Sequence, residues 1–266
     1  MESELKPESE LEKETIVILM AGGLGKRMKS DIPKVLHRIR GLPMIVQLLL
    51  SIRQIPNHPI TKILIVVGKY RPIIESTIFK YIDSHKIKFI DQPEALGTGH
   101  AIQCCRDELL LHPPSANVLI LSSDVPMLSF FTMEKILDDL ETIRIVTTCF
   151  EQPKGYGRIV KNEHGIFERI VEEKDATPEQ RRIQCVNGGI YAVNCGVLCR
   201  YLPLIQNENE QREYYLTDIV EIIKKNENMA VDMMEIEKSN QREIMGVNTP
   251  EELEQLNKIS KFFNKK

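Results

Sequence analysis

The chain has 266 residues, 42% of them apolar, and is therefore long enough to bury a hydrophobic core of its own. Its 35 basic and 38 acidic residues leave a formal charge of −3, which provides no overall positive field to attract a nucleic acid. No segment approaches the roughly 20 consecutive apolar residues that a membrane-spanning helix needs. The composition predicts an ordinary globular protein that binds neither a nucleic acid nor a membrane.

The first fourteen residues, Met1 to Glu14, carry six glutamates and two lysines and lack the apolar block of a secretory signal. We therefore expect residues 1–14 to form a disordered acidic tail, and the protein to stay in the cytoplasm. Six scattered cysteines without a CxxC pair indicate reduced, mostly buried thiols rather than disulfides. Cys195 and Cys199 lack the second ligand pair that a metal site would need.

After the tail, apolar runs alternate with segments of helical spacing. The runs Thr15–Met20, Ile63–Val67 and Val118–Leu121 are typical of strands that are covered on both faces of a parallel sheet. Segments of helical length and spacing lie at about 43–55, 72–82 and 98–110. This alternation predicts an α/β fold with a mostly parallel sheet.

From about residue 144 to 195 the chain becomes rich in predicted strands, which indicates an insertion beside the sheet. Arg158–Val160 and Ile166–Val171 flank Asn162-Glu163-His164-Gly165, a predicted hairpin turn. Near the end, Thr249-Pro250-Glu251-Glu252 combines a capping hydroxyl, a proline at the first helical position and a carboxylate three residues after the cap. This pattern predicts the start of a helix.

The predicted strand Thr15–Met20 opens into a loop with three glycines, Gly22, Gly23 and Gly25, followed by two cationic residues. Glycines let the backbone approach an anion closely, and the Arg27 guanidinium matches the geometry of a phosphate. The loop therefore indicates phosphate binding. A tight strand-to-helix turn with incidental surface cations remains the alternative.

Two widespread phosphate-binding loops do not fit this segment. A Walker-type loop ending at Gly25-Lys26 would need glycine at Met20 and a hydroxyl at Arg27. A dinucleotide-binding fingerprint starting at Gly23 would need glycine or alanine at Met28.

Asp124 follows the apolar run 117–123, so it is expected at the carboxyl end of a parallel strand, where such sheets bind ligands. An aspartate at this position is as often a turn or cap residue as a metal ligand. Thr98 could likewise be a helix cap, and Glu172 could face solvent within the charge run 172–175.

The motifs AGGLGKRM (21–28) and SDIPKVLH (30–37) resemble the signature of sugar-1-phosphate nucleotidyltransferases. The likeness is greatest to the uridylyltransferase domain of the bacterial N-acetylglucosamine-1-phosphate uridylyltransferases. Seven further motifs in the same order extend it over nearly the whole chain after the tail: DQPEALGTGHA (91–101), SDVP (123–126), GYGRIV (155–160), IVEEKDAT (170–177), VNGGI (186–190), EYYLTDI (213–219) and GVNTP (246–250). Together, the motifs are far more specific than any one of them.

The resemblance implies a fold and a set of site residues. The fold would be a Rossmann-like, mostly parallel mixed sheet with a strand-rich sugar-binding part at about 144–195, within a single nucleotidyltransferase domain over 15–266. Arg27 and Lys34 would be the catalytic cations on the triphosphate. The residues implied to contact the nucleotide are Met20, Ala21, Gly22, Gly23, Lys34, Gln92, Gly97 and Thr98. The last three would lie at the base.

The resemblance further implies a Mg²⁺ ion held by Asp124 and Asn248, which carry the oxygen ligands that magnesium prefers. It implies that Gly157, Glu172 and Asn187 bind the sugar. Three residues depart from the usual family pattern: Ser123 replaces a glycine, Gly188 stands where a threonine is common, and Arg212 stands where a glycine is common.

The implied reaction is uridylyl transfer from UTP to N-acetylglucosamine 1-phosphate, with release of pyrophosphate. No general base is needed, because a phosphate monoester is already anionic near neutral pH. We expect no acetyl-transferring half, because the sequence shows no hexapeptide repeat. Two alternatives stay open: uridylyl or thymidylyl transfer to another sugar such as glucose 1-phosphate, and a non-catalytic protein that binds a nucleotide sugar and regulates a partner. The sequence indicates no oligomeric state.

Overall fold

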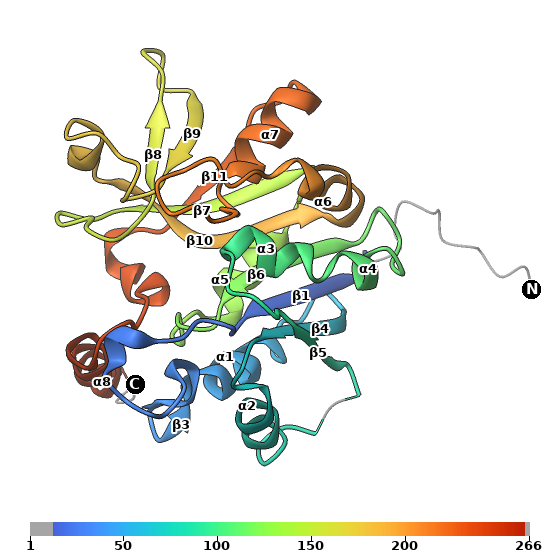
Figure 1. Cartoon of the computed structure of the whole chain (residues 1–266), viewed down its shortest axis with the longest axis vertical. Helices are drawn as coiled ribbons and strands as arrows, with labels where there is room; N and C mark the ends of the chain where they lie inside the picture. The colour runs from blue at the N-terminus through green and yellow to red at the C-terminus, as the bar shows by residue number, and fades with distance from the viewer. Residues whose placement is uncertain (1–12, 84, 264–266) are drawn as a thin grey trace, which may run out of the picture.

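A computed structural model describes residues 13–83 and 85–263, so the predicted tail lies almost wholly outside the described residues. Its centre is a nine-stranded mixed sheet (Figure 1). β5, β4, β1 and β6 are parallel neighbours in that order, β10 runs antiparallel between β6 and β7, and β11 is parallel to β7. The strands of this path are β1 (Thr15–Met20), β4 (Ile60–Val67), β5 (Ile87–Asp91), β6 (Asn117–Ser122), β7 (Ile143–Cys149), β10 (Cys185–Asn194) and β11 (Asp232–Glu235).

The strand-rich segment is part of this sheet rather than an insertion beside it. β10 pairs with β6 and β7, so the main hydrogen-bond ladder continues through residues 143–194. Only the hairpin of β8 (Arg158–Lys161) and β9 (Phe167–Val171) stands apart (Figure 1), joined to β10 where Arg158 lies opposite Val186. Its turn is the predicted one, because the Asn162 carboxamide accepts hydrogen bonds from the backbone of His164 and Ile166.

Helices cover both faces of the sheet, because successive strand residues point to opposite sides. Val17 and Leu19 of β1 face the cluster formed with α1, α2 and α5, whereas Ile16 and Ile18 face α3, α4, α6 and α7. The helices are α1 (Met44–Ile52), α2 (Arg71–Ile78), α3 (Thr98–Gln103), α4 (Arg106–Leu109), α5 (Phe130–Leu137), α6 (Cys195–Tyr201), α7 (Asp218–Glu227) and α8 (Pro250–Phe263). Short elements complete the chain: 3-10 helices Lys26–Met28, Lys34–Leu36, Gln180–Arg182, Leu202–Leu204 and Lys238–Ile244, and the small hairpin of β2 (Arg38–Ile39) and β3 (Leu42–Pro43).

The predicted helix over 98–110 is two helices, because the backbone tightens between α3 and α4. There the Cys105 amide donates to the Ile102 carbonyl, three residues back, at 2.9 Å. The tighter turn keeps Ile102, Cys105 and Leu109 buried in one apolar cluster. The cysteines are all free, but only three of the six are buried; Cys149 is exposed.

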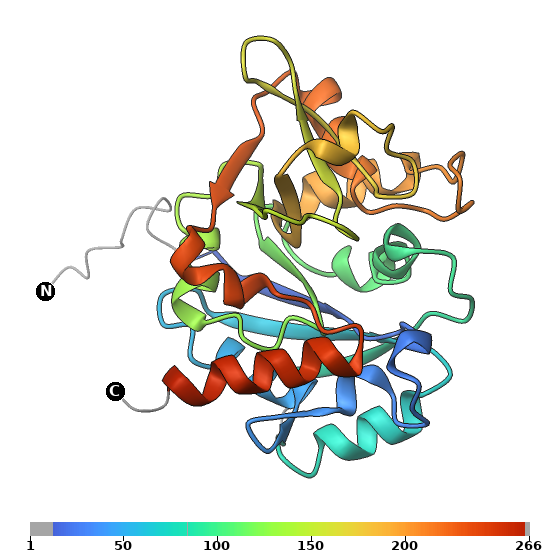
Figure 2. The ribbon, with the colours of Figure 1, turned by 90° about the vertical axis from the view of Figure 1, so that its left-hand side faces the viewer.

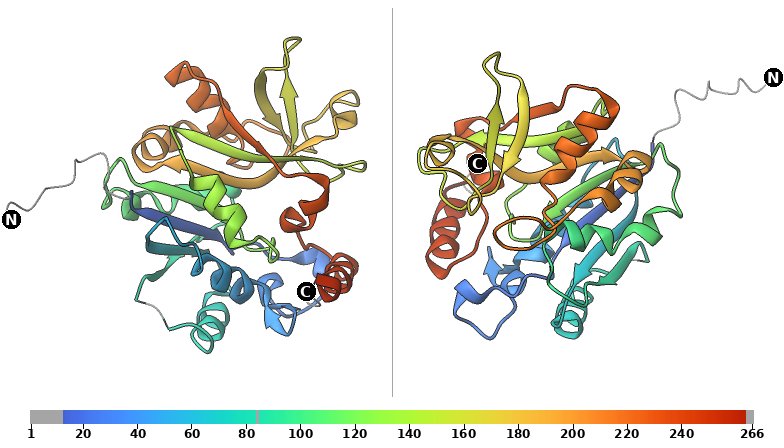
Figure 3. Two further views of the ribbon diagram at one scale, coloured as in Figure 1. Left: turned by 180° about the vertical axis from the view of Figure 1, so that it is seen from behind. Right: turned by 45° about the horizontal axis from the view of Figure 1, so that its top comes forward.

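The last helix brings the C-terminal part of the chain back to the loop after β1 (Figures 2 and 3). Its start is the predicted capping box: Thr249 Oγ1 accepts from the Glu252 amide at 3.2 Å, and Glu252 Oε2 accepts from the Thr249 amide at 3.1 Å. Leu256 of α8 packs with Met28 and Ile39 in a small separate cluster. Among helices of the described ranges, none combines the length and the apolar character needed to cross a bilayer.

Candidate active site

Two glycines of the loop at the carboxyl end of β1, Gly22 and Gly25, lie where a side chain would meet a close neighbour. Gly25 has φ +60°, and a Cβ there would lie 2.8 Å from Lys34 Cβ. A Cβ on Gly22 would lie 2.8 Å from Gln92 Oε1. The loop therefore packs directly against two of the predicted site residues.

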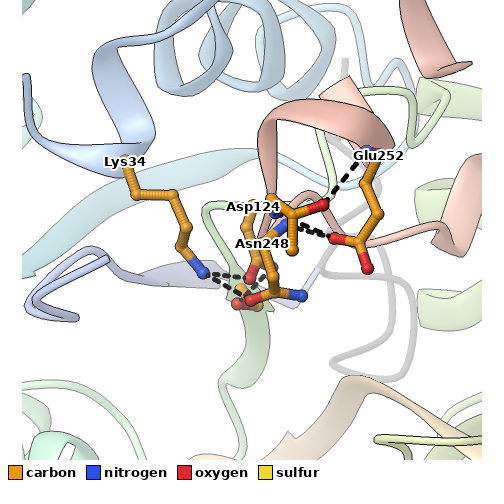
Figure 4. Close-up of polar contacts among 6 residues, drawn as sticks. Lys34, Asp124, Asn248 and Glu252 are labelled. Carbon is orange, nitrogen blue, oxygen red and sulfur yellow. Dashed lines mark hydrogen bonds and ion pairs between the residues drawn. The ribbon is translucent and has the colours of Figure 1, made fainter. Parts of the chain in front are cut away.

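Lys34, Asp124 and Asn248 meet at one point (Figure 4). Lys34 Nζ donates to Asp124 Oδ2 at 2.5 Å and to Asn248 Oδ1 at 3.1 Å. Asp124 follows the end of β6, and Asn248 precedes α8. Because the Val247 amide donates to the Asp124 carbonyl at 2.9 Å, the backbone also ties these two segments together.

Asp124 is held as a carboxylate. Burial alone would raise its pKa, but the Lys34 charge, together with hydrogen bonds from Lys34 and Ser122, outweighs burial and keeps the pKa below its ordinary value. The Ser122 hydroxyl donates to Asp124 Oδ1 at 2.7 Å. Both carboxylate oxygens of Asp124 are thus engaged, one by each neighbour.

Two adjoining cavities open on either side of this cluster. The larger, of about 520 Å³, is lined by the glycine loop together with Lys34, Gln92, Gly97 and Asp124. The smaller, of about 250 Å³, is lined by Arg27, Gly157, Glu172, Asn187 and Asn248, and also by Asp124. The residues common to both are Met20, Thr98, Ser122 and Asp124. Every residue implied by the family resemblance therefore lines one of two connected cavities.

The three residues expected at the base all line the larger cavity. Gln92 Nε2 donates to the Gly97 carbonyl at 3.0 Å. Gly97 has φ +111°, and a Cβ there would lie 2.6 Å from the Tyr214 carbonyl oxygen, so only glycine fits. Thr98 is not the helix cap, because Gly97 precedes α3 and Thr98 Oγ1 accepts from the Leu216 amide at 3.0 Å.

The smaller cavity is polar where a sugar would be bound. Asn187 Nδ2 donates to the Tyr191 hydroxyl at 2.6 Å, and Asn187 Oδ1 accepts from the Gly189 amide at 3.2 Å. Each end of this amide retains one further hydrogen-bonding position. A Cβ on Gly157 would lie 2.9 Å from Ile170 Cγ2, so glycine keeps the wall of the cavity open there.

Glu172 does not simply face solvent, since it lines the smaller cavity. Burial raises its pKa, and the charges of Asp175 and Glu213 add to this, whereas a hydrogen bond from Thr217 opposes it. Burial and the nearby charge of Glu172 likewise raise the pKa of Asp218 to about 6. A group of closely spaced carboxyls favours hydroxyl donors as ligands over further anions.

Arg27 lines the smaller cavity and not the larger one that contains the glycine loop. It is exposed, on the 3-10 helix Lys26–Met28. Lys26 and Lys34 are the cations of the larger cavity. The family resemblance singled out Arg27 but not Lys26.

The three departures from the family pattern have different structural settings. Arg212 has φ +53°, a left-handed conformation that explains why glycine suits this position. A Cβ on Gly188 would lie 3.1 Å from the Val146 carbonyl oxygen, so a threonine would need β7 to shift slightly. Ser123 is fully buried, and its hydroxyl has no hydrogen-bond partner among the described residues.

Sequence reasoning missed three supporting residues. Ser122 orients Asp124, Thr217 Oγ1 donates to Glu172 Oε1 at 2.9 Å, and Glu252 Oε2 accepts from the Asn248 amide at 2.6 Å. Thr217 lies within the motif EYYLTDI, and the sequence predicts Glu252 only as a capping carboxylate. Motif position was thus the only signal available for Thr217.

The residues at the Lys34 cluster fit a magnesium ion. Two oxygen-bearing side chains from different elements converge on one positive charge, and magnesium commonly takes one or two protein oxygens plus substrate phosphates. Larger clusters, with three or more His, Cys, Asp or Glu side chains placed to hold a metal, do not occur within 13–83 and 85–263. The fit is therefore to a site that the substrate completes.

Comparison with known proteins identifies the family. The sequence pattern of the family described as "Nucleotidyl transferase" matches residues 16–240. A "Probable UDP-N-acetylglucosamine pyrophosphorylase" of Acanthamoeba polyphaga mimivirus is 39% identical over 249 residues, which are 92% of this chain and 96% of that protein. The "Bifunctional protein GlmU" of Caldicellulosiruptor saccharolyticus is 35% identical over 247 residues, which are 91% of this chain but 51% of that protein. The chain thus spans about half the length of this bifunctional relative.

The fold is similar to that of a crystal structure from Bacillus anthracis described as a "Putative Glucose-1-Phosphate Thymidylyltransferase". The TM-score is 0.66 at 18% identity, over 92% of this chain and 95% of the other. The predicted fold class is confirmed. The chain belongs to the nucleotidyl transferase family and is a nucleotidyltransferase.

Proposed function

We infer that this protein transfers a uridylyl group from UTP to N-acetylglucosamine 1-phosphate and releases pyrophosphate. The observation that carries the inference is the meeting of two cavities at the Lys34–Asp124–Asn248 cluster. The similarity to a relative named as a UDP-N-acetylglucosamine pyrophosphorylase, over 96% of that relative, supports this choice of base and sugar.

Charge neutralisation would dominate the chemistry, because two polyanions must approach each other. Lys34 and Lys26 line the cavity proposed for the triphosphate, and Arg27 lies beside the proposed path of the sugar phosphate. Asp124 and Asn248 would hold a magnesium ion, which would offset charge on the phosphates when bound. The acceptor phosphate is itself the nucleophile, so no protein side chain needs to remove a proton.

Glu172 and Asn187 would bind the sugar hydroxyls and the amide of the acetylated sugar. Glu172 offers carboxylate oxygens, and Asn187 offers both a donor and an acceptor. The main chain at Gly157 would add a close contact. Thr217 and Tyr191 orient these two side chains through the hydrogen bonds at 2.9 and 2.6 Å.

The test is turnover with UTP, N-acetylglucosamine 1-phosphate and Mg²⁺, with each component omitted in turn and pyrophosphate release as the readout. A panel with dTTP and with glucose 1-phosphate checks the alternative substrates. We expect the highest kcat/KM for the named pair. A higher value for another pair would move the assignment to that substrate, and acetyl transfer from acetyl-CoA to glucosamine 1-phosphate would contradict a purely uridylyl-transferring protein.

A non-catalytic nucleotide-sugar-binding regulator is the remaining alternative. The presence of Arg27, Lys34 and Asp124 at the two cavities argues against it, because a protein that only binds would not need to keep all three. Binding of UDP-N-acetylglucosamine without any turnover would favour this alternative.

A further inference from the structure

The ammonium group of Lys34 stands where the two proposed metal ligands converge. Figure 4 shows Lys34 reaching toward Asp124 and Asn248 from one side, with Glu252 on the other. The side chains of Lys34 and Asp124 are only 15% and 14% exposed, so little water screens the 2.5 Å ion pair between them. The Asp124 charge is thus neutralised by a side chain of the protein itself.

A divalent ion and this ammonium compete for the same oxygens. Lys34 Nζ uses Asp124 Oδ2 and Asn248 Oδ1, and the other Asp124 oxygen accepts from Ser122. Cations a few ångströms apart repel one another strongly where water is scarce. A metal ion can therefore bind both ligands well only when the ammonium has moved away.

The larger cavity offers the Lys34 ammonium a second position. Its side chain also lines the larger cavity, which Gly22 and Gly23 line as well. Close packing against Gly25 restrains its Cβ, whereas the carbons beyond it can rotate. A triphosphate in this cavity would offer the ammonium new anionic partners.

We propose that Lys34 is an exchangeable occupant of the metal site. In the substrate-free protein it holds Asp124 and Asn248 in position, and it leaves them for the triphosphate when a divalent ion binds. This inference rests on the proposed function and deepens it. Metal binding to the free protein is consequently weak, and the triphosphate strengthens it by giving Lys34 another partner, a coupling that is reciprocal.

The test measures Mn²⁺ binding to the substrate-free protein by electron paramagnetic resonance and calorimetry. Mn²⁺ is the probe because it accepts oxygen ligands and has a direct signal. Lys34→Met removes the competing ammonium, so we expect it to bind Mn²⁺ at least ten-fold more tightly than the wild type. Lys34→Met with Asp124→Asn should lose this gain.

Lys26→Met is the matched control, because Lys26 lines the same cavity and removing it changes the net charge equally. We expect its Mn²⁺ affinity to stay within two-fold of the wild type. Equal affinities for Lys34→Met and the wild type, or the same gain in both lysine variants, would overturn the proposal. If Lys34→Met unfolds without metal, recovery of a cooperative melt on adding Mn²⁺ supports the proposal, and failure to recover counts against it.

The wild-type turnover assay separates this inference from the proposed function. If the wild type turns over the substrates but Lys34→Met does not bind Mn²⁺ more tightly, the exchange is contradicted and the proposed reaction is not. If Lys34→Met binds Mn²⁺ more tightly but the wild type turns over no substrate pair, the exchange is supported and the proposed reaction is contradicted.

Discussion

Single polar side chains at the strand ends are each oriented by a neighbouring polar group. Ser122 and Lys34 hold Asp124, and Thr217 holds Glu172. Because Asp124 and Glu172 would contact the proposed ligands, whereas Ser122 and Thr217 only position them, substitutions of the two kinds should have different kinetic signatures.

Asp124→Asn is expected to lower kcat/KM by at least about 100-fold, since it removes the negative charge that would bind the proposed metal ion. Steady-state pyrophosphate release measures the effect. Asp138→Asn is the control, because Asp138 pairs with His58 and lines neither cavity. An Asp124 variant that turns over like the wild type would indicate a different site.

Thr217→Val is expected to raise KM for the sugar phosphate several-fold, with a smaller effect on KM for UTP. The substitution removes the donor that orients Glu172 and leaves a buried carboxyl whose pKa rises further above its ordinary value. Thr217→Ser keeps the hydroxyl and should restore the KM. A change in kcat alone would argue against a positioning role.

At the scale of elements, the sheet depends on contacts that join strands and helices from different parts of the chain. Glu108 of α4 accepts from Lys88 of β5 at 2.5 Å and pairs with Lys62 of β4 at 3.5 Å. β7 and β10 are joined along a ladder in which Cys149 lies opposite Cys185. Each contact can be tested by measurements that do not depend on the proposed function.

Glu108→Gln is expected to lower the free energy of unfolding at pH 7 by about 1–3 kcal/mol. Burial alone would raise the pKa of Glu108, but the two lysines outweigh it and lower the pKa. A lowered pKa stabilises the fold above the ordinary carboxyl value of about 4.3, and this stabilisation is lost as the pH falls through the lowered value.

Urea unfolding of wild type and Glu108→Gln from pH 7 to pH 3 measures this dependence. The difference between them should shrink below about pH 4. Glu254→Gln, in an exposed pair with Lys258, is the control and should change stability little. A difference that does not vary with pH would show that packing rather than charge holds α4.

Oxidised glutathione is expected to produce a Cys149–Cys185 disulfide, with loss of 2 Da, because the register places the two residues directly opposite each other. The Phe150 amide donates to the Gln184 carbonyl, so the cysteines form the neighbouring non-hydrogen-bonded pair, in which Cα atoms lie about 4.5 Å apart. Intact mass and peptide mapping measure the bond. Cys149→Ser should abolish it; a disulfide elsewhere instead would contradict the register.

At the scale of the whole molecule, the site lies between two halves of one sheet. β1 and β6 end at the larger cavity, and residues of β10 and at the ends of β8 and β9 line the smaller one. The segment before α8 brings Asn248 close to Asp124, where the two halves meet. A ligand that fills both cavities would therefore stabilise the two halves together.

UDP-N-acetylglucosamine is expected to raise the melting temperature more than UMP does at the same concentration, because in the proposed site only the nucleotide sugar would reach both cavities. A ligand at 100 times its Kd adds about 2.7 kcal/mol to the free energy of unfolding. Differential scanning fluorimetry over a concentration series measures the shift. Equal shifts for UMP and the nucleotide sugar would indicate that the smaller cavity does not bind the sugar.

β1, the hairpin turn at 162–165, the capping box of α8 and the family could be predicted from the sequence. These features depend on neighbouring residues: a run of apolar side chains, an asparagine that bonds to its own turn, or a short motif.

Three features could not be predicted without the fold: β10 joins the strand-rich segment to the main sheet, Arg27 and Lys34 line different cavities, and the Lys34 ammonium contacts both proposed metal ligands. The last contact joins residues 90 and 214 positions apart, and no local pattern specifies such a pairing. It forms because the carboxyl ends of parallel strands meet at one edge of the sheet and α8 returns to that edge.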